Sequence, residues 1–173
     1  MQNNASHWED AITATDAAGK TVAAFPSRED FERAMIYAQF GQTISLAQLL
    51  QRDVVNALML MRIMEPDLPT ITQFVCFIEH QESATFPTLL SRLREFADVP
   101  AELSELLAAA ADRSTYLEHR FFTDTDTTAS IGSAEGRATL FNHLREDTEL
   151  FRETARILEE AIAPIRKARL GSD

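Results

Sequence analysis

Apolar residues recur at helical spacing along most of this chain. From position 31 they return every three or four residues as far as Met61, which predicts one long helix. Ser27 is suited to cap its start, with Asp30 three residues later in place of the glutamate of a capping box. Phe25 precedes the cap as a candidate hydrophobic staple, and Gly41 lies inside the pattern without having to end it.

Prolines separate the next predicted helices. The pattern predicts helices over residues 70–82 and 85–96, and a further helix from residue 98 to about 117. Thr85 and Asp98 are placed to cap the second and third of these, and Pro87 and Pro100 fall in their first turns, where proline is tolerated. Four consecutive alanines at 108–111 would let a neighbouring helix pack closely.

The last part of the chain predicts a loop followed by a second long helix. Residues 123–133 are rich in Thr, Asp, Ser and Gly, which is typical of a loop. A helix is expected from about Ser133, ended by Pro164 and Gly171. Asp147 interrupts its otherwise apolar stripe, which consists of Leu140, Leu144, Phe151, Ala155, Leu158, Ile162 and Ile165.

These elements predict an all-α protein, an antiparallel bundle of four to five helices with an irregular N-terminal arm. The arm covers residues 1–26 and the helical bundle domain residues 27–173. Within the arm, residues 21–25 form the only strand-like run, and Trp8 and Phe25 are expected to pack it against the bundle.

Composition and charge narrow the function. The 16 basic and 27 acidic residues give a net charge of −11, which disfavours RNA or DNA as a partner. The one cysteine, Cys76, cannot form a disulfide within the chain and is expected to be buried among its apolar neighbours. The first residues lack the pattern of a signal peptide, and no apolar run is long enough to span a bilayer. We therefore expect a cytoplasmic protein that does not bind membranes.

Common catalytic and metal-binding motifs are missing. None of the histidines at 7, 80, 119 and 143 follows a glutamate by three residues, as the di-metal sites of four-helix bundles require. No histidine or cysteine cluster has zinc spacing, and the glycines form no nucleotide-binding loop. The sequence predicts neither a metal nor a cofactor.

One segment, residues 111–122, combines residues suited to ribonuclease chemistry. His119 could move a proton to or from a ribose 2′-hydroxyl near neutral pH, and Arg113 could stabilise charge on the phosphate, with no metal required. Ser114, Tyr116 and Arg120 would line such a site.

This segment resembles the Arg-x(4–6)-His motif of the HEPN superfamily, with Arg113 and His119 in the two motif positions. The superfamily consists of helical proteins that include many metal-independent ribonucleases of toxin–antitoxin and phage-defence systems, whose active site is typically shared between two protomers. Residues 28–165 are also similar to an uncharacterised bacterial all-helical family, with matching positions Leu117, His119, Phe121, Phe122, Gly136 and Arg137. The resemblance implies a homodimer.

The chain departs from the bacterial pattern at Ser114 and Thr115, where arginine and asparagine are expected. Six residues of helix turn the chain by about 600°, so Arg113 and His119 would lie about 120° apart on a straight helix. Asp112 would share a face with His119, and a structural interpretation is that Asp112 simply orients this histidine. Catalysis would require the two motif residues to meet across a dimer interface or through a distorted helix.

Three functions remain open from the sequence. The leading interpretation is a binding or assembly protein that forms a homodimer through apolar helix faces and acts with a protein partner. The first alternative is a metal-independent endoribonuclease that uses Arg113 and His119. The second is a small-molecule sensor whose pocket is lined by methionines, of which four lie at 35, 59, 61 and 64.

Overall fold

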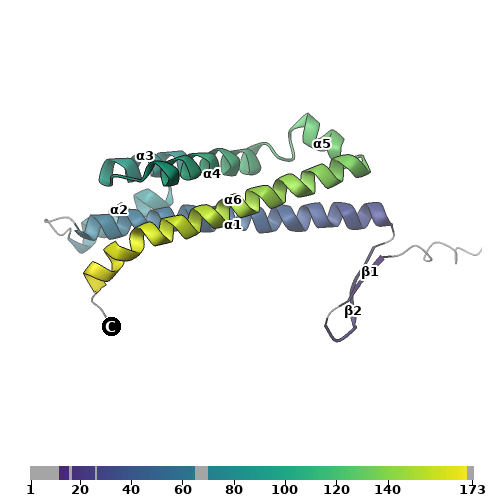
Figure 1. The fold of residues 1–173 in the computed structure, drawn as a ribbon, viewed down its shortest axis with the longest axis horizontal. Coiled ribbons are helices and arrows are strands. Elements are labelled where there is room, and N and C mark those ends of the chain that lie inside the picture. Colours follow the sequence, from purple (N-terminus) through teal and green to yellow (C-terminus); the bar gives the residue numbers. More distant parts are fainter. Residues whose placement is uncertain (1–11, 16, 26, 65–69, 171–173) are drawn as a thin grey trace, which may run out of the picture.

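The computed structural model describes residues 12–15, 17–25, 27–64 and 70–170. It confirms an all-α helical bundle, to which a short N-terminal hairpin is attached (Figure 1). The described part contains six helices, rather than the four to five expected. No helix in these ranges has both the length and the hydropathy needed to cross a membrane. The elements in chain order are β1 (Ile12–Thr15), β2 (Thr21–Phe25), α1 (Arg28–Met64), α2 (Ile71–Glu82), α3 (Phe86–Phe96), α4 (Ala101–His119), α5 (Thr125–Ile131) and α6 (Ala134–Leu170).

The N-terminal arm is more regular than the sequence indicated. β1 and β2 pair antiparallel, with Ile12 opposite Phe25, so the expectation of an irregular arm is corrected over these residues. The turn between the strands contains Gly19 at φ +78°, a backbone conformation that residues with a Cβ rarely adopt. Trp8, expected to pack the arm, lies outside the described residues.

The start of α1 confirms the predicted cap and staple. The Asp30 amide donates to Ser27 Oγ over 3.1 Å, and Ser27 Oγ donates in turn to the Asp30 carboxylate over 2.7 Å. The Phe25 ring meets the Phe31 ring edge-on with centroids 5.4 Å apart. The helix continues unbroken through Gly41 to Met64.

The two longest helices, α1 and α6, lie side by side and run parallel. Glu32 contacts Arg137 and Thr43 contacts Thr148, and both pairs are separated by 105 positions. A constant offset means that the two helices advance in the same direction. The expected antiparallel arrangement is therefore corrected for this pair. After α1 and before α6 in the sequence, the chain returns along α4, which runs in the opposite direction. It leads to α5, which lies beside the starts of α1 and α6 (Figure 1).

The apolar stripe of α6 forms much of the core, as predicted. Leu144, Phe151 and Leu158 are almost completely buried between α6 and its neighbours. The same core contains Leu50, Val54 and Leu58 from α1, and Leu89, Leu93, Leu107 and Leu117 from α3 and α4. Ala110 and Ala111 are buried too, so half of the alanine run serves the close packing that was expected of it.

The predicted loop at 123–133 contains a helix, α5. Its N-cap is Asp124, whose carboxylate accepts from the Asp126 amide over 3.0 Å. α5 packs so closely against the start of α6 that a Cβ on Gly136 would lie 2.6 Å from the Ser130 Cα. Loop-like composition gave no sign of this helix because its seven residues owe their stability to the cap and to packing on α6.

Three further expectations are corrected. α4 begins at Ala101 with Pro100 as its N-cap, so Asp98 does not cap it. α6 does not end at Pro164 but continues to Leu170, because Pro164 is on the exposed side and the carbonyl it leaves unpaired can reach water. Cys76 is exposed rather than buried, since α2 turns Phe77 and Gln81 towards the bundle and Cys76 away from it.

Candidate functional site

Arg113, the proposed phosphate-binding residue, forms an ion pair between two helices. From α4 its Nε and Nη2 donate to Asp147 Oδ1 and Oδ2 on α6, both over 2.7 Å. The Asp147 side chain is only 9% exposed and that of Arg113 38%. The hydrogen bonds from Asp147 hold the pKa of the Arg113 guanidinium above its ordinary value, against the opposing effect of partial burial. The break in the apolar stripe of α6 is therefore the partner of this arginine.

The ion pair belongs to a larger group of polar side chains in the core, which we call the buried polar layer: Gln39 and Thr43 of α1, Arg113 of α4, and Asp147 and Thr148 of α6. The hydroxyl oxygens of Thr43 and Thr148 lie 2.8 Å apart, and the Gln39 amide donates to Thr148 over 3.0 Å. The Thr148 hydroxyl also reaches the Leu144 carbonyl over 2.9 Å. No side-chain nitrogen or oxygen of these five residues is buried without a partner.

Tyr116 connects α4 to α5. Its hydroxyl is 2.9 Å from the Thr127 hydroxyl and donates to the Asp124 carboxylate over 3.3 Å. Its ring lies under the Arg113 guanidinium, whose central carbon is 4.8 Å from the ring centroid. Arg113 is thus held by a carboxylate on one side and an aromatic ring on the other.

His119, the proposed acid–base residue, is in a different environment. It is the last residue of α4 and its side chain is 70% exposed, with Nε2 3.8 Å from the Glu118 carboxylate. No hydrogen bond or ion pair found among the described residues joins His119 to Arg113 or to Asp112. Asp112 is itself exposed, so the predicted orienting contact is not seen there.

The other two predicted lining residues also separate. Ser114 is buried and its hydroxyl donates to Glu118 over 3.0 Å. Arg120 is exposed and forms the C-cap of α4, where its amide donates to the Tyr116 carbonyl. The structure therefore brings Arg113 together with Tyr116, and leaves Ser114 inside the bundle and His119 and Arg120 in solvent.

The phenylalanine pair after α4 is part of an aromatic cluster on α1. Phe121 is buried and stacks on Phe40 with centroids 4.9 Å apart, so it is part of the core at the end of α4. Phe122 is exposed but lies 4.7 Å from Phe40 and 5.6 Å from Tyr37. Only the first of the two rings is therefore a core residue.

The described part of the structure contains no cluster of side chains suited to bind a metal ion. Over residues 12–15, 17–25, 27–64 and 70–170, no three His, Cys, Asp or Glu side chains gather closely enough to hold an ion.

Sequence reasoning missed the most exposed apolar surface, on α2. Ile71 is 85% exposed and Val75 45%, and both lie on one side of the helix with the partly buried Phe74 and Ile78. We call these four residues the apolar face of α2. A signal was present, because the stretch 68–78 contains no charged residue in a chain with 43 of them.

Comparison with known proteins adds no relative to this description. No protein-family model, no curated protein and no solved structure matches the chain.

Proposed function

We propose that this protein is a binding and assembly protein that pairs with a second copy of itself through the apolar face of α2. The observation that carries the proposal is the exposure of Ile71 and Val75, one helical turn apart, on a helix that turns Phe77 and Gln81 towards the bundle. Isolated exposed apolar residues are ordinary, but Ile71 and Val75 form a continuous stripe with the partly buried Phe74 and Ile78 at positions i, i+3, i+4 and i+7.

Charge favours a second copy at this face over any other place on the surface. Two chains of net charge −11 repel each other, and the repulsion is smallest where neither presents charged groups. Along the sequence the stripe is such a place, since residues 68–78, between Asp67 and Glu79, include no charged residue. A two-fold axis through α2 would set the apolar face of one copy against that of the other.

The size of the apolar side chains is sufficient for a measurable association. Burying an isoleucine or valine side chain contributes about 1.5–3 kcal/mol, and a symmetric interface would bury Ile71 and Val75 twice over. Part of that gain offsets the cost of bringing two molecules together. We therefore expect a dimer that dissociates on dilution rather than a permanent one.

Sedimentation equilibrium over a range of protein concentrations tests the proposal. The wild type is expected to show a monomer–dimer equilibrium, and the double variant Ile71→Gln/Val75→Gln to be monomeric at every concentration. Leu49→Gln is the matched control, because Leu49 of α1 is 43% exposed but is not part of this face. A monomeric wild type, or a dimer that survives the double substitution, would refute it.

The ribonuclease alternative receives less support from the geometry. Its arginine already donates two hydrogen bonds to Asp147, and its histidine is in solvent at the end of α4. Incubation of the purified protein with RNA in EDTA tests it, with His119→Ala as the critical variant. Cleavage by the wild type that His119→Ala abolishes would establish the alternative, whereas an inert wild type would leave the assembly proposal in place.

A further inference from the structure

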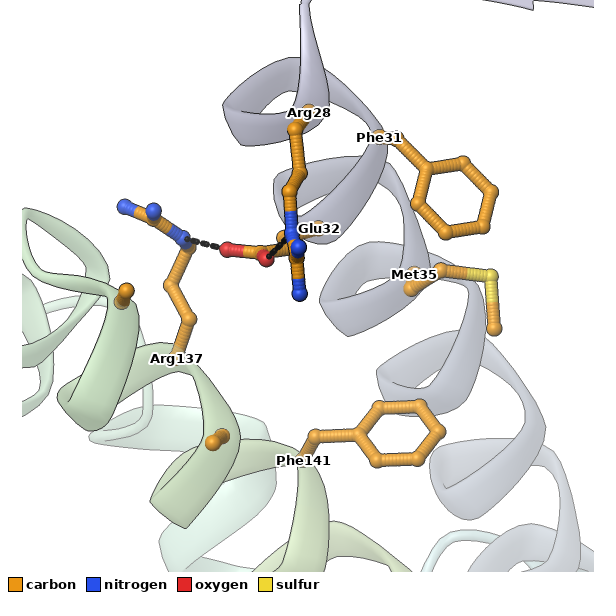
Figure 2. Close-up of a pocket in the computed structure, with 8 residues that line it drawn as sticks. Arg28, Phe31, Glu32, Met35, Arg137 and Phe141 are labelled. Carbon is orange, nitrogen blue, oxygen red and sulfur yellow. Dashed lines mark hydrogen bonds and ion pairs between the residues drawn. The ribbon is translucent and has the colours of Figure 1, made fainter. Parts of the chain in front are cut away.

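A cavity lies where the first turns of α1 and α6 meet. Because the two helices run parallel, their N-terminal ends come together at one end of the bundle (Figure 1). The cavity has a volume of about 400 Å³, within the range of sites that bind small molecules. Figure 2 shows its principal lining residues, which are Arg28, Phe31, Glu32, Met35, Arg137 and Phe141.

One side of the cavity is apolar. Phe31 and Met35 of α1 and Phe141 of α6 form it, and Figure 2 shows their side chains gathered on the same side. The edge-on contact with Phe25 of the hairpin helps to fix the Phe31 ring. Ala134 and Ala138, whose side chains are small, leave the space open on α6. This side is suited to an alkyl chain or an aromatic ring.

The other side carries a chain of charged groups. The Glu32 carboxylate accepts from Arg28 Nε and from Arg137 Nε, both over 2.9 Å, and these bonds hold the pKa of Glu32 below its ordinary value. The Arg137 side chain is 8% exposed, and its Nη1 donates to the Ile131 carbonyl. Arg137 therefore uses these donors to stabilise the fold.

Arg28 differs from Arg137 because its terminal nitrogens are available to donate hydrogen bonds to a ligand. Its side chain is 85% exposed and extends past the Glu32 carboxylate beside the space between the helices (Figure 2). Within the described part of the chain, neither of its terminal nitrogens has a hydrogen-bond partner. Glu29 lies 3.6 Å from Arg137 Nη1, so the donors left for a ligand on this side are those of Arg28.

We infer that this cavity binds a small amphipathic carboxylate, with its apolar body between Phe31, Met35 and Phe141 and its carboxylate on the terminal nitrogens of Arg28. The planar guanidinium can donate two parallel hydrogen bonds to the two carboxylate oxygens. This site is on α1 and α6, away from the apolar face of α2, so the inference is independent of the proposed function.

The volume sets the size of the ligand. One water occupies about 30 Å³ in the liquid, so about 400 Å³ holds on the order of a dozen non-hydrogen atoms. Decanoate has about that number and carries a single carboxylate. Decanol and decylamine have nearly the same length and replace the carboxylate with a neutral and a cationic group.

Isothermal titration calorimetry with these three compounds tests the inference on the full chain, below the concentrations at which they form micelles. Decanoate is expected to bind one per chain and at least tenfold more tightly than decanol, with decylamine weakest. Arg28→Gln should weaken decanoate binding about tenfold and leave decanol unchanged. Ala138→Leu should abolish binding of both, because the larger side chain fills the cavity. Arg145→Gln, an exposed arginine further along α6, is the matched control and should have no effect.

Three results would overturn the inference. They are no saturable decanoate binding to the wild type, equal affinity for decanoate and decanol, and equal effects of Arg28→Gln and Arg145→Gln on decanoate. Circular dichroism of each variant shows whether it keeps the helical fold. If Ala138→Leu does not fold, the comparison of Arg28→Gln with Arg145→Gln still decides the outcome.

Discussion

The buried polar layer and the apolar face of α2 depart from the usual distribution of side chains in opposite directions. In the first, an aspartate, two threonines and a glutamine lie in the middle of the bundle beside the half-buried Arg113. In the second, an isoleucine and a valine are exposed on a surface that elsewhere carries many charges. The difference is in their partners. No buried side-chain nitrogen or oxygen of the layer lacks a partner within the chain, whereas Ile71 and Val75 are left open to water.

This comparison separates stabilisation of the fold from binding. A buried polar group with all its hydrogen bonds satisfied serves to hold helices in register, and it needs nothing from outside. An exposed apolar stripe gains free energy only when another surface covers it. The layer is therefore where substitutions should alter folding, and the apolar face is where they should alter association.

The largest expected effect is that of Asp147→Ala. It would leave the half-buried Arg113 guanidinium without its carboxylate, and we expect a loss of about 2–3 kcal/mol in the free energy of unfolding. Urea denaturation followed by circular dichroism measures it. Glu149→Ala, which removes an exposed ion pair with Arg152, should change stability by less than about 0.5 kcal/mol. Equal effects of the two substitutions would show that the layer is not a source of stability.

A smaller effect is expected for Thr148→Val. This substitution keeps the shape of the side chain and removes the hydroxyl that bonds Gln39 and Thr43, at a cost of about 1 kcal/mol. The same denaturation experiment applies. Thr148→Ser keeps the hydroxyl, so a loss of stability in Thr148→Ser as large as in Thr148→Val would attribute the effect to the methyl group.

Substitution of the apolar face should leave folding almost unaltered. In Ile71→Gln/Val75→Gln we expect the stability of the dilute protomer to change by less than about 0.5 kcal/mol, because both side chains are exposed. The dependence of the melting temperature on protein concentration should disappear, since it arises from association. Differential scanning calorimetry at several concentrations measures both quantities. A large loss of stability at high dilution would mean that α2 belongs to the core.

The smallest effect is expected at Asp53, and it depends on pH. Desolvation raises the pKa of the Asp53 carboxyl, assisted by Glu159 and opposed by Arg52 and Arg166. The folded protein therefore holds this proton more tightly than the unfolded chain, and stability falls as pH rises from about 3.9 through the raised pKa. Asp53→Asn should be slightly more stable than the wild type at pH 7, by at most about 0.5 kcal/mol, and no more stable at pH 3. Thermal unfolding at the two pH values checks this, and equal differences at both would contradict it.

Much of the fold could be predicted from local signals. The cap at Ser27, the helix of residues 71–82 and the apolar stripe of α6 all follow from residues close together in the sequence. The parallel pairing of α1 and α6 does not, because an apolar stripe specifies which face is buried and not which way the neighbour runs. The helix α5 was missed for a related reason, since its stability depends on contact with α6.

The candidate site, like the fold, could be predicted from the sequence only in part. Helical phase correctly indicated that Arg113 and His119 point in different directions, and the break in the stripe at Asp147 marked a buried polar residue. Which residue supplied that partner could not be read from the sequence, because Arg113 is 34 positions away. The cavity between α1 and α6 could not be predicted from the sequence either, because the residues that line it are about a hundred positions apart.

Because α1 and α6 pair in parallel with an offset of 105 positions, the ribosome completes α1 well before it makes α6. The apolar side of α1 is complete once residue 64 has been made, but its main partner begins only at Ala134. A ribosome adding about 5–20 residues per second would leave that side uncovered for several seconds. The nascent chain is then most exposed to aggregation, and it is at this stage that a chaperone would have most to protect.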